Sequence, residues 1–416
     1  MILEDCCFRA VASGDPLNRR ILIHDYAGHG FIAELSRELA ARGYQVIHVY
    51  GAHNPTPKGY VSRLPDDPEG LTFLPISLSQ PFQKYSFFRR WQQEREYGRR
   101  LAEAVLTINP DIVISAQSPL DAERLLDRAC RKAGIPRVHW LQDVIGVATA
   151  KILRKKIPIL GGLIGQYYLA MEKSLLKSAD LVLSISEDFS PLLDAWGIPA
   201  SKVRVLPNWP TLKYLPVVKK DNRWSREQHI QDRFVFLYTG TLGFKHNPKL
   251  LLDLADSFED EPEVCVVVAS EGPGADWLKE QITTRDGSNM LILPYQPLDR
   301  YAQVLASGDV LVGILEEDAG VYSVPSKILS YLCARRPLLL SMPVENRAAR
   351  IVCENEAGIV IPPCSRKEFL ESAFALWSNE TSRINYGKRG REYAEIHFNI
   401  AQIGDSFEMF IKEIDY

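Results

Sequence analysis

The sequence predicts an α/β protein built from two doubly wound, Rossmann-like domains. At 416 residues, the chain is too long for one ordinary hydrophobic core. From Arg20 onward, short apolar runs alternate with amphipathic segments of helix length, which is typical of parallel sheets covered by helices on both faces. The polar segment 219–232 divides this alternation into two series. Two domains of this kind, facing each other, would enclose a cleft.

The two series of apolar runs define the expected domains and strands. We expect a first domain over residues 1–207, a linker over 208–232 and a second domain over 233–386. The tail, 387–416, is helical by pattern and has no strand partner, so we expect it to pack back on the first domain. The expected strands are 21–24, 45–50, 71–76, 111–115, 137–141, 181–185 and 203–206, followed by 234–238, 264–269, 290–293, 310–314, 338–340 and 359–361.

The composition argues against several classes of protein. Lysine and arginine number 49 against 52 aspartates and glutamates, and the net charge of −3 gives no reason to expect nucleic acid as a partner. The 7 cysteines are scattered without metal-ligand spacing, which indicates reduced thiols and a cytoplasmic protein. The N-terminal residues, which include Glu4 and Asp5, do not fit a signal peptide, and no apolar run is long enough to cross a bilayer.

A glycine-bearing turn follows the first expected strand. It contains Gly28, His29 and Gly30 and precedes an amphipathic helix. In doubly wound sheets, ligands bind beyond the carboxyl ends of the strands, where this turn would lie. The two glycines would let the backbone approach a ligand closely. A plain tight turn explains the same residues, so both interpretations stay open here.

Similar turns follow the first two strands of the second series. Gly240 and Gly243 bracket one turn, with Lys245 just beyond it and a helix starting near Pro248. Bare amides, a point charge and a helix N-terminus together suit a diphosphate group. The segment "ASEGPGADWL" repeats the pattern with a turn at Gly272. For either turn alone, a left-handed turn beside a solvated lysine is the simpler alternative.

A third feature of this kind lies in the segment "VYSVPSKILSYLCARRPLLLSMP". Ser326 and Lys327 open an expected helix directly after Pro325. The positive end of the helix dipole would face whatever lies before Ser326, which favours a phosphate. The alternative is that Ser326 only caps the helix. All three features would meet at the carboxyl edge of one sheet, and packing alone rarely requires that.

These segments, in this order, resemble the family-4 glycosyltransferases of GT-B fold, in particular the colanic-acid and O-antigen type. The second half contributes "YTGTLGFKHN", "SEGPG", "LPYQPLDRYAQVLASGDVLV" and "VPSKILSYLCARRPLLL". The first half contributes "GHGFIAELSRELAARGYQV", "WLQDV" and "LVLSISEDFSPLLDAWGIPASKVRVLPNW". The resemblance implies transfer of a sugar from a nucleotide-diphosphate sugar with retention of configuration and without a metal ion or cofactor. It also implies that the second domain holds the nucleotide and that the first domain binds the acceptor.

The motifs and the resemblance together give the expected site residues. Lys245 matches the basic residue that would neutralise the diphosphate leaving group, and Lys327 would assist it. Asp143, at a strand end, would orient the attacking acceptor hydroxyl, although it could instead cap the next helix. His139 reads as strand packing. The expected donor-binding residues are Gly240, Thr241, Gly243, Gly272, Glu317, Tyr322, Ser323, Val324 and Ser326, and the acceptor or cleft residues are Gly28, His29, Gly30 and Gln142.

The chain departs from the wider family at several of these positions. Tyr322 and Ser330 stand where much of the family has two glutamates. Thr241 replaces an arginine, and Gln142 replaces a histidine. Either the nearby acidic residues Glu316, Glu317 and Asp318 substitute for the glutamates, or they form a solvated loop.

Two other functions are alternatives to the transferase. A non-catalytic nucleotide-sugar-binding protein of the same fold is the main alternative, because the paired glutamates are missing. A dinucleotide oxidoreductase is weaker, because neither glycine turn has the G-x-G-x-x-G spacing followed by an acidic residue.

Basic residues stand beside apolar ones in two helical stretches of the first domain. Lys151, Arg154, Lys155 and Lys156 precede the apolar run 157–160, and a basic and aromatic mixture covers 85–100. Such a mixture suits an anionic membrane surface on the inner face of the membrane. It also fits an acceptor saccharide linked to a polyprenyl diphosphate, as the resemblance suggests. A packed helical hairpin with solvated charges is an equal alternative.

Overall fold

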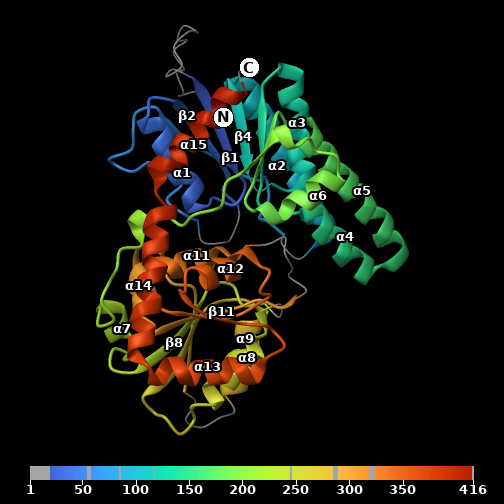
Figure 1. Ribbon diagram of the computed structural model, residues 1–416. Helices are drawn as coiled ribbons and strands as arrows, with labels where there is room; N and C mark the ends of the chain where they lie inside the picture. The colour runs from blue at the N-terminus through green and yellow to red at the C-terminus, as the bar shows by residue number, and fades with distance from the viewer. Residues whose placement is uncertain are drawn as a thin grey trace. The chain divides into compact units, whose positions relative to one another are not determined.

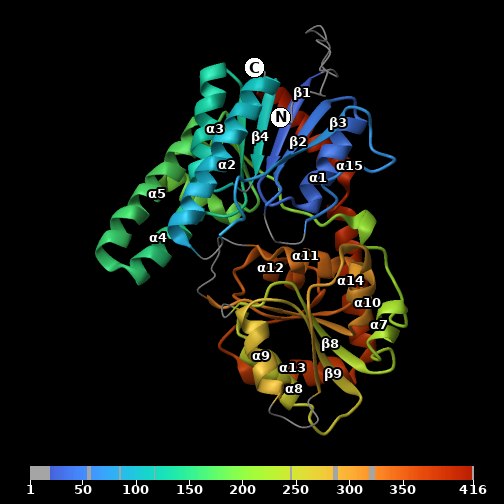
Figure 2. The same ribbon diagram turned by 180° about the vertical axis from the view of Figure 1, so that it is seen from behind.

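The computed structural model describes residues 19–53, 58–83, 86–116, 118–243, 246–283, 289–317 and 324–414. The chain divides into two compact units: Met1–Pro207 with Ile400–Tyr416 forms the first, and Asn208–Asn399 forms the second. Each unit is a parallel sheet flanked by helices, as Figures 1 and 2 show. The predicted α/β class with two Rossmann-like domains is therefore confirmed.

The sheet of the first unit has seven strands. Their order is β3-β2-β1-β4-β5-β6-β7, and each neighbouring pair is parallel. The strands are nearly continuous apolar runs, as expected for strands that are buried on both faces. Their bounds are β1 (Arg20–Asp25), β2 (Gln45–Gly51), β3 (Leu71–Ile76), β4 (Ile112–Ala116), β5 (Arg137–Leu141), β6 (Leu181–Ser184) and β7 (Val203–Val205).

Helices cover both faces of this sheet. The helices α1 (Gly30–Ala41) and α15 (Ile400–Glu413) pack together on one side, and α2 (Phe87–Ile108) packs with α3 (Leu120–Ala133) on the other (Figure 1). Strand residues such as Leu22 and Val113 form a core with Tyr97 and Leu101 of α2. The remaining helices are α4 (Ile145–Lys156), α5 (Pro158–Ser178), which packs on α4 and α3, and α6 (Ser190–Ala195).

The sheet of the second unit has six strands in the order β10-β9-β8-β11-β12-β13, again all parallel. The order reverses next to β8, so the carboxyl ends of β8 and β11 flank the position at which doubly wound sheets bind ligands. The strands are β8 (Phe234–Thr239), β9 (Val264–Ala269), β10 (Met290–Leu293), β11 (Val310–Ile314), β12 (Leu338–Ser341) and β13 (Gly358–Ile361).

Eight helices within the described residues complete the second unit. The helices α8, α9 and α13 lie along one side of the sheet, where Phe236 and Phe258 anchor the core (Figures 1 and 2). The helices α7 and α10 pack together, as do α11 and α14. The bounds are α7 (Arg223–Glu227), α8 (Pro248–Asp256), α9 (Pro273–Thr283), α10 (Tyr301–Ser307), α11 (Ser326–Cys333), α12 (Arg347–Glu354), α13 (Arg366–Ser378) and α14 (Glu380–His397).

The domain boundaries differ from the expected ones at two places. The expected linker, 208–232, belongs to the second unit, because Trp224 is fully buried there and its indole N–H donates to Gln296 at 2.8 Å. The expected tail, 387–416, is divided: α14 packs on α11 in the second unit, and only the residues from Ile400 join the first. There, Arg42 at the end of α1 pairs with Asp405 at 2.7 Å and Glu408 at 2.8 Å.

Within the described residues, no helix is both long enough and apolar enough to span a bilayer.

Candidate functional site

The turn that follows β8 is held from below by tyrosines. The backbone N–H of Thr239 donates to the hydroxyl of Tyr331 at 2.9 Å, and the Thr239 hydroxyl lies 3.0 Å from the hydroxyl of Tyr301. Burial raises the pKa of Tyr301 to about 12 and also raises the pKa of Tyr331, so both hydroxyls remain protonated at neutral pH. The next residue, Gly240, has a φ of +88°, which a residue with a side chain rarely adopts. The strand end therefore leads into a fixed, bare turn.

Lys327 from the first turn of α11 lies against this turn. Its Nζ donates to the Tyr238 hydroxyl at 2.6 Å and lies 3.9 Å from the centroid of the same ring. A Cβ at Gly240 would lie only 3.4 Å from Lys327 Cε and 3.5 Å from Nζ. The structure thus places a lysine ammonium beside a glycine turn at the start of a helix. Ser326 is the first residue of α11, and its N-cap, Pro325, makes no side-chain cap hydrogen bond.

The second glycine turn packs directly against the first. The Leu242 N–H donates to the Glu271 carbonyl at 3.0 Å, and the Gly274 N–H donates to the Leu242 carbonyl at 2.9 Å. Gly272 has a φ of +119°, and a Cβ there would lie 2.9 Å from the Leu242 carbonyl oxygen. This close approach admits only glycine. The Thr241 hydroxyl lies 2.6 Å from the hydroxyl of Tyr295, so the two turns form one surface with hydroxyl groups on it.

Only some of the remaining residues expected to bind the donor lie in the described part of the chain. A Cβ at Gly243 would enter open space, which leaves room near the turn. Val324 lies just before α11, and Glu317 is exposed beyond the end of β11. Three expected residues, Lys245, Tyr322 and Ser323, lie outside the described part of the chain.

In the first unit, the turn after β1 contains a histidine held by an aspartate. The carboxylate of Asp25 accepts from the Ala27 N–H at 3.1 Å and from the His29 N–H. The same carboxylate lies 2.8 Å from His29 Nδ1. Asp25 is fully buried, whereas the His29 side chain is 40% exposed. The contact with Asp25 therefore fixes the orientation of the imidazole through Nδ1, and the ring remains partly exposed to solvent.

The ionisation of this pair follows from its geometry. Burial acts to raise the pKa of Asp25, but the charge and hydrogen bonds of His29 outweigh it and lower this pKa to about 2. Burial acts to lower the pKa of His29, but Asp25 and, more weakly, Asp143 raise it above its ordinary value. An ionised Asp25 beside a readily protonated His29 is the expected state near neutral pH.

Gly28 and Gly30 are packed by a second backbone segment. The Gly59 N–H donates to the Gly28 carbonyl at 2.9 Å, and a Cβ at Gly59 would collide with Gly30. In this structure, the backbone at Gly59 therefore occupies the close position that these glycines leave open. The geometry agrees with the tight-turn alternative and does not by itself indicate a ligand.

Asp143 and Gln142 follow β5 at the same sheet edge. Gln142 is buried, and Asp143 precedes α4, whose N-cap is Val144 without a side-chain cap hydrogen bond. Asp143 thus stands one residue before the N-cap position of α4. The carboxylate of Glu172 on α5 accepts from the Gly146 N–H at 2.9 Å at the start of this helix. Burial raises the pKa of Glu172 to about 7, with a further contribution from the charge of Asp143.

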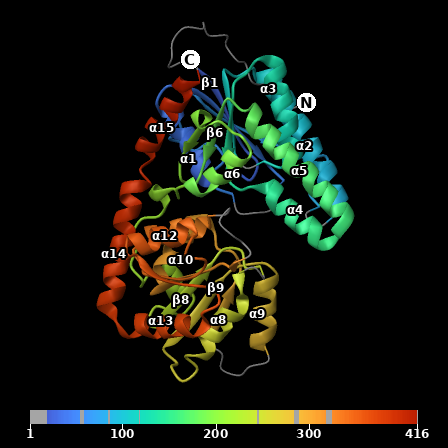
Figure 3. The same cartoon turned by 45° about the vertical axis from the view of Figure 1, so that its right-hand side comes forward.

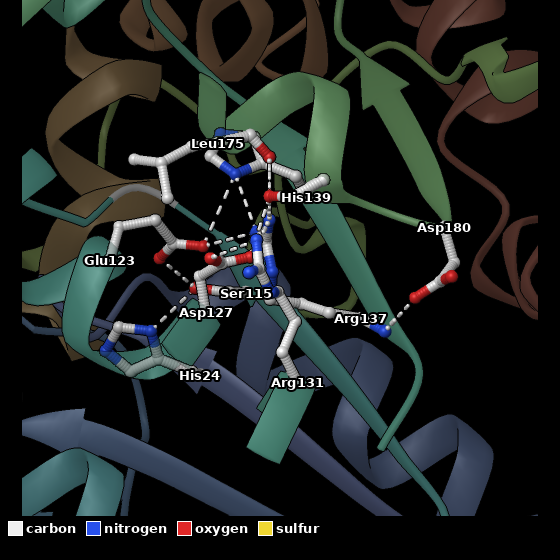
Figure 4. Close-up of polar contacts among 10 residues, drawn as sticks. His24, Ser115, Glu123, Asp127, Arg131, Arg137, His139, Leu175 and Asp180 are labelled. Carbon is white, nitrogen blue, oxygen red and sulfur yellow. Dashed lines mark hydrogen bonds and ion pairs between the residues drawn. The ribbon is translucent and has the colours of Figure 1, made fainter. Parts of the chain in front are cut away.

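Beneath this edge, a buried ionic network joins β1, β4, β5 and α3 (Figure 4). Arg137 donates from Nη1 to Glu123 at 2.8 Å and from Nη2 to the Leu175 carbonyl at 2.7 Å. His139 Nδ1 lies 3.3 Å from Glu123, and Ser115 donates to the same carboxylate at 2.6 Å. Glu123 and Arg137 are almost fully buried. These groups are partners of one another within the core, which agrees with the packing role expected for His139, although Arg137 Nε has no hydrogen-bond partner among the described residues.

The structure adds residues to the site that the sequence analysis missed. Asp25 ends β1 four residues before His29, and an acidic residue at the end of a strand before a glycine turn was a usable signal. Glu172 lies 29 positions beyond Asp143 in the middle of a helix, and nothing local in the sequence distinguishes it. Tyr238 and Tyr331 resemble ordinary core residues. Among the described residues, no group of three His, Cys, Asp or Glu side chains is arranged to hold a metal ion.

Two protein families match the chain. Residues 29–209 match the glycosyl transferase 4-like domain, and residues 220–393 match the glycosyl transferases group 1. The WcaI protein of Escherichia coli (strain K12), whose name assigns it a glycosyl transferase step in colanic acid biosynthesis, is 26% identical over 238 residues. That match covers 56% of this chain and 58% of the relative, so the chain spans less than two thirds of the length of WcaI.

Solved structures share the architecture at low sequence identity. Sucrose-phosphate synthase from Thermosynechococcus elongatus superposes with a TM-score of 0.70 at 14% identity, over 95% of this chain and 99% of that chain. Anabaena HepE, solved in complex with UDP and glucose, gives a TM-score of 0.69 at 14% identity, over 95% and 100%. WaaG, a glycosyltransferase involved in lipopolysaccharide biosynthesis, gives 0.66 at 15% identity, over 94% and 99%. These likenesses show the shared GT-B fold, with its two parallel sheets. The two family matches, which together span most of the chain, show that it belongs to the family-4 glycosyltransferases.

Proposed function

We propose that the protein transfers a sugar from a nucleotide-diphosphate sugar to a saccharide acceptor in polysaccharide synthesis, with retention of configuration and without a metal ion. The observation that carries this proposal is the position of Lys327 beside the Gly240 turn at the start of α11. A cation, bare backbone and the positive end of a helix dipole converge there, and all three attract phosphate. The relative HepE has been solved with UDP-glucose, which supports a nucleotide sugar as the donor.

The chemistry requires charge stabilisation at the leaving group. As the bond between the anomeric carbon and the diphosphate breaks, negative charge grows on the diphosphate, and positive charge grows on the sugar. In this proposal, Lys327 and Lys245 stabilise the diphosphate, and the N–H groups at the start of α11 add to their effect. These groups take the place of a metal ion, so chelators should leave the reaction unchanged.

On the acceptor side, the proposal assigns roles to the edge of the first sheet. Asp143 orients the attacking hydroxyl, and His29, held by Asp25, lies at the same edge. The acceptor in this proposal is a saccharide on a polyprenyl diphosphate, used at the cytoplasmic face of a membrane. WcaI and WaaG, whose names refer to colanic acid and lipopolysaccharide biosynthesis, support a cell-surface saccharide.

The α4–α5 hairpin supplies a surface that fits membrane contact. Its far ends extend away from the first sheet, as the three views of the molecule show (Figure 3). Exposed apolar side chains cluster there, with Ile159 86% and Leu163 68% exposed, while Met171 and Leu175 bury the other end against α3. Arg154 and Lys155 are exposed beside this apolar tip. A protruding apolar tip flanked by cations favours an anionic lipid surface over the packed-hairpin alternative.

The transferase proposal is tested by donor turnover. The purified protein is given UDP- and GDP-sugars with a polyprenyl-diphosphate-linked saccharide, and release of free nucleoside diphosphate is measured with and without EDTA. We expect turnover of one donor class, no effect of EDTA, and a product with the anomeric configuration of the donor by NMR. Tight donor binding without release in any combination would instead support the non-catalytic binding protein.

The membrane proposal is tested by liposome sedimentation. Charge reversal at Arg154, Lys155 and Lys156 should release the protein from anionic liposomes and leave nucleotide binding unchanged. The matched control reverses three exposed cations of α3: Arg128, Arg131 and Lys132. Equal sedimentation of the first variant and the wild type would return the hairpin to a packing role.

A further inference from the structure

A pocket lies on the first unit, and several of its lining residues belong to the basic and aromatic stretch described above. Its volume is about 710 Å³, within the range of about 300–1,000 Å³ that is usual for ligand pockets. It is formed between the N-terminal half of α2 and the segment that follows β3. Its lining is rich in arginine and glutamine, and includes Gln83, Arg89, Trp91, Gln92, Arg95 and Arg99.

Hydrogen bonds from α2 hold the wall of this pocket in place. The side chain of Gln93 accepts from the Gln83 N–H at 2.9 Å and donates to the Pro81 carbonyl at 2.9 Å. The carboxylate of Glu96 accepts from the Ser79 N–H at 2.8 Å and from the Ser79 hydroxyl at 3.0 Å. Gln93 is almost fully buried. The concave shape is therefore fixed by the fold and does not depend on a bound molecule.

The pocket carries an excess of positive charge. The two acidic residues of this part of α2 already have partners, because Glu94 pairs with Arg90 at 2.7 Å and Glu96 pairs with Arg100 at 2.7 Å. By contrast, the side chains of Arg89, Arg95 and Arg99 make no ion pair or hydrogen bond within the described part of the chain. Arg95 and Arg99 are one helical turn apart, so their guanidinium groups repel each other. A bound anion would relieve this repulsion.

The other lining groups indicate what kind of anion fits. Trp91 forms an aromatic wall, with the Arg95 guanidinium 4.8 Å from its ring centroid. Carbohydrate rings pack against such aromatic surfaces, and the amides of Gln80, Gln83 and Gln92 can bond hydroxyl groups. Arginine forms paired hydrogen bonds with planar carboxylates. An aromatic wall, amides and unpaired arginines together match a sugar that carries a carboxylate.

The pocket is joined to the expected acceptor edge by a short chain of contacts. Phe82, in the pocket wall segment, lies 5.2 Å from the His53 ring, measured between centroids. His53 Nε2 lies 3.0 Å from the Tyr26 hydroxyl, and Tyr26 directly follows Asp25. The pocket and this edge therefore belong to one packed region of the first unit.

We propose that this pocket binds an acidic sugar unit of the acceptor, so that the acceptor is an anionic saccharide that is recognised away from its reacting hydroxyl. The inference rests on the proposed function, since it names the chemical class of that acceptor. It concerns binding to the first unit only.

Calorimetric titration with a hyaluronan tetrasaccharide, which carries uronic acid carboxylates, tests the inference without any donor. The matched probe is the same tetrasaccharide with its carboxyl groups reduced to alcohols. We expect the acidic form to bind about tenfold or more tightly than the reduced form, because the reduced form loses the charge-assisted contacts with arginine. Equal affinity for the two forms would overturn the proposal.

Variants then locate the binding. Arg95→Gln combined with Arg99→Gln should weaken binding of the acidic tetrasaccharide at least tenfold, whereas Arg128→Gln on α3 should leave it unchanged. Unfolding curves check that both proteins fold. Loss of binding in the Arg128→Gln control alone, or in no variant, would overturn the assignment to this pocket.

Further probes separate this proposal from other anions and from the transferase reaction. Inorganic phosphate or anionic vesicles that bind through Arg95 and Arg99 while the tetrasaccharide does not would show a phosphate or membrane site and overturn the proposal. Donor release without any preference for acidic acceptors would also overturn it and leave the proposed function intact. Selective tetrasaccharide binding by a protein without transfer activity would support the pocket and count against the proposed function.

Discussion

The carboxylate of Glu172 on α5 accepts the backbone N–H of Gly146 at 2.9 Å and so closes the start of α4. Helix starts leave N–H groups without partners, and a neighbouring helix supplies the acceptor here. This hydrogen bond lies in the interior of the protein, because only 1% of Glu172 is exposed. Burial therefore opposes its ionisation, and its pKa rises from 4.5 to about 7.

Glu172→Gln should stabilise the protein above neutral pH. A carboxyl whose pKa is raised on folding adds stability below its unfolded pKa of 4.5, and this stability is lost as the pH rises through about 7. Glutamine keeps an acceptor for the Gly146 N–H and cannot ionise. We expect the variant to gain up to about 3 kcal/mol relative to the wild type at pH 8 and little at pH 4. Urea unfolding at both pH values measures this, with Glu103→Gln on exposed α2 surface as the control.

Asp25→Asn should lower the pKa of His29 and remove a pH-dependent part of the stability. The wild-type pair contributes fully between the unfolded pKa of Asp25, 3.8, and that of His29, 6.5. The contribution falls as the pH drops toward about 2, where Asp25 is protonated, and again as it rises through the raised pKa of His29. Within that window we expect a loss of about 2 kcal/mol.

NMR titration of the His29 ring, with unfolding curves at pH 3, 5 and 9, follows the Asp25 prediction. Asp111→Asn is the control, because Asp111 accepts the Arg20 N–H at 2.7 Å without a histidine partner. An unchanged His29 titration in Asp25→Asn would contradict the assigned pairing.

Lys327→Met should weaken binding of the nucleoside diphosphate about tenfold or more and leave binding of the bare nucleoside nearly unchanged. The reason is that methionine keeps the packing over Tyr238 and removes only the charge that faces the glycine turn. Lys249→Met is the control, since Lys249 pairs with Asp253 on α8 and is 66% exposed. Calorimetry with the diphosphate and the nucleoside compares the three proteins. Equal losses for both ligands would mean that Lys327 supports the fold and not the phosphates.

Lys245→Ala is expected to lower turnover roughly a hundredfold to a thousandfold, by analogy with the removal of one anion-stabilising donor from an active site. Transfer rates at saturating donor measure it. Unchanged turnover would remove Lys245 from the leaving-group machinery.

Arg137→Met should destabilise the first unit by about 3–5 kcal/mol, because it leaves the Glu123 and Asp127 carboxylates without their buried counter-ion. Arg131→Met, whose side chain is 69% exposed and 4.0 Å from Asp127, should cost less than about 1 kcal/mol. Adding Glu123→Gln to Arg137→Met should restore part of the loss, since one unpaired charge is removed. Chemical unfolding of the four proteins measures these differences, and equal effects of the two single arginine variants would refute the account.

The strands were predictable because a strand that is buried on both faces is a nearly continuous run of apolar residues. Each of the thirteen expected strands is present within two residues of its predicted ends, as for Val264–Ala269, which is apolar throughout. The segment 208–232 was misjudged because its charged residues conceal Trp224, whose burial depends on contacts with α10 and Gln296. Local polarity indicated a linker, and tertiary packing decided otherwise.

The candidate site was predictable only where backbone geometry dictates sequence. The turns at Gly240 and Gly272 require glycine because of their positive φ angles, so they can be recognised in the sequence. The role of Asp25 could have been predicted, because this residue ends a strand just before His29. The role of Glu172 could not, since it arises from the packing of α5 on α4, and a glutamate in a helix is otherwise ordinary. Long-range partners of this kind have no periodic or local signature.

The path of the chain has a consequence for biosynthesis. Residues 400–414 follow the entire second unit in the sequence, yet Phe407 packs on Trp140, and Arg42 relies on Asp405 and Glu408. The second unit is thus inserted within the first. During translation, the part of α1 that contacts α15 stays uncovered until α15 leaves the ribosome, while the second unit can already be complete. We therefore expect nascent chains that lack α15 to depend on chaperones and to be degraded through their first unit.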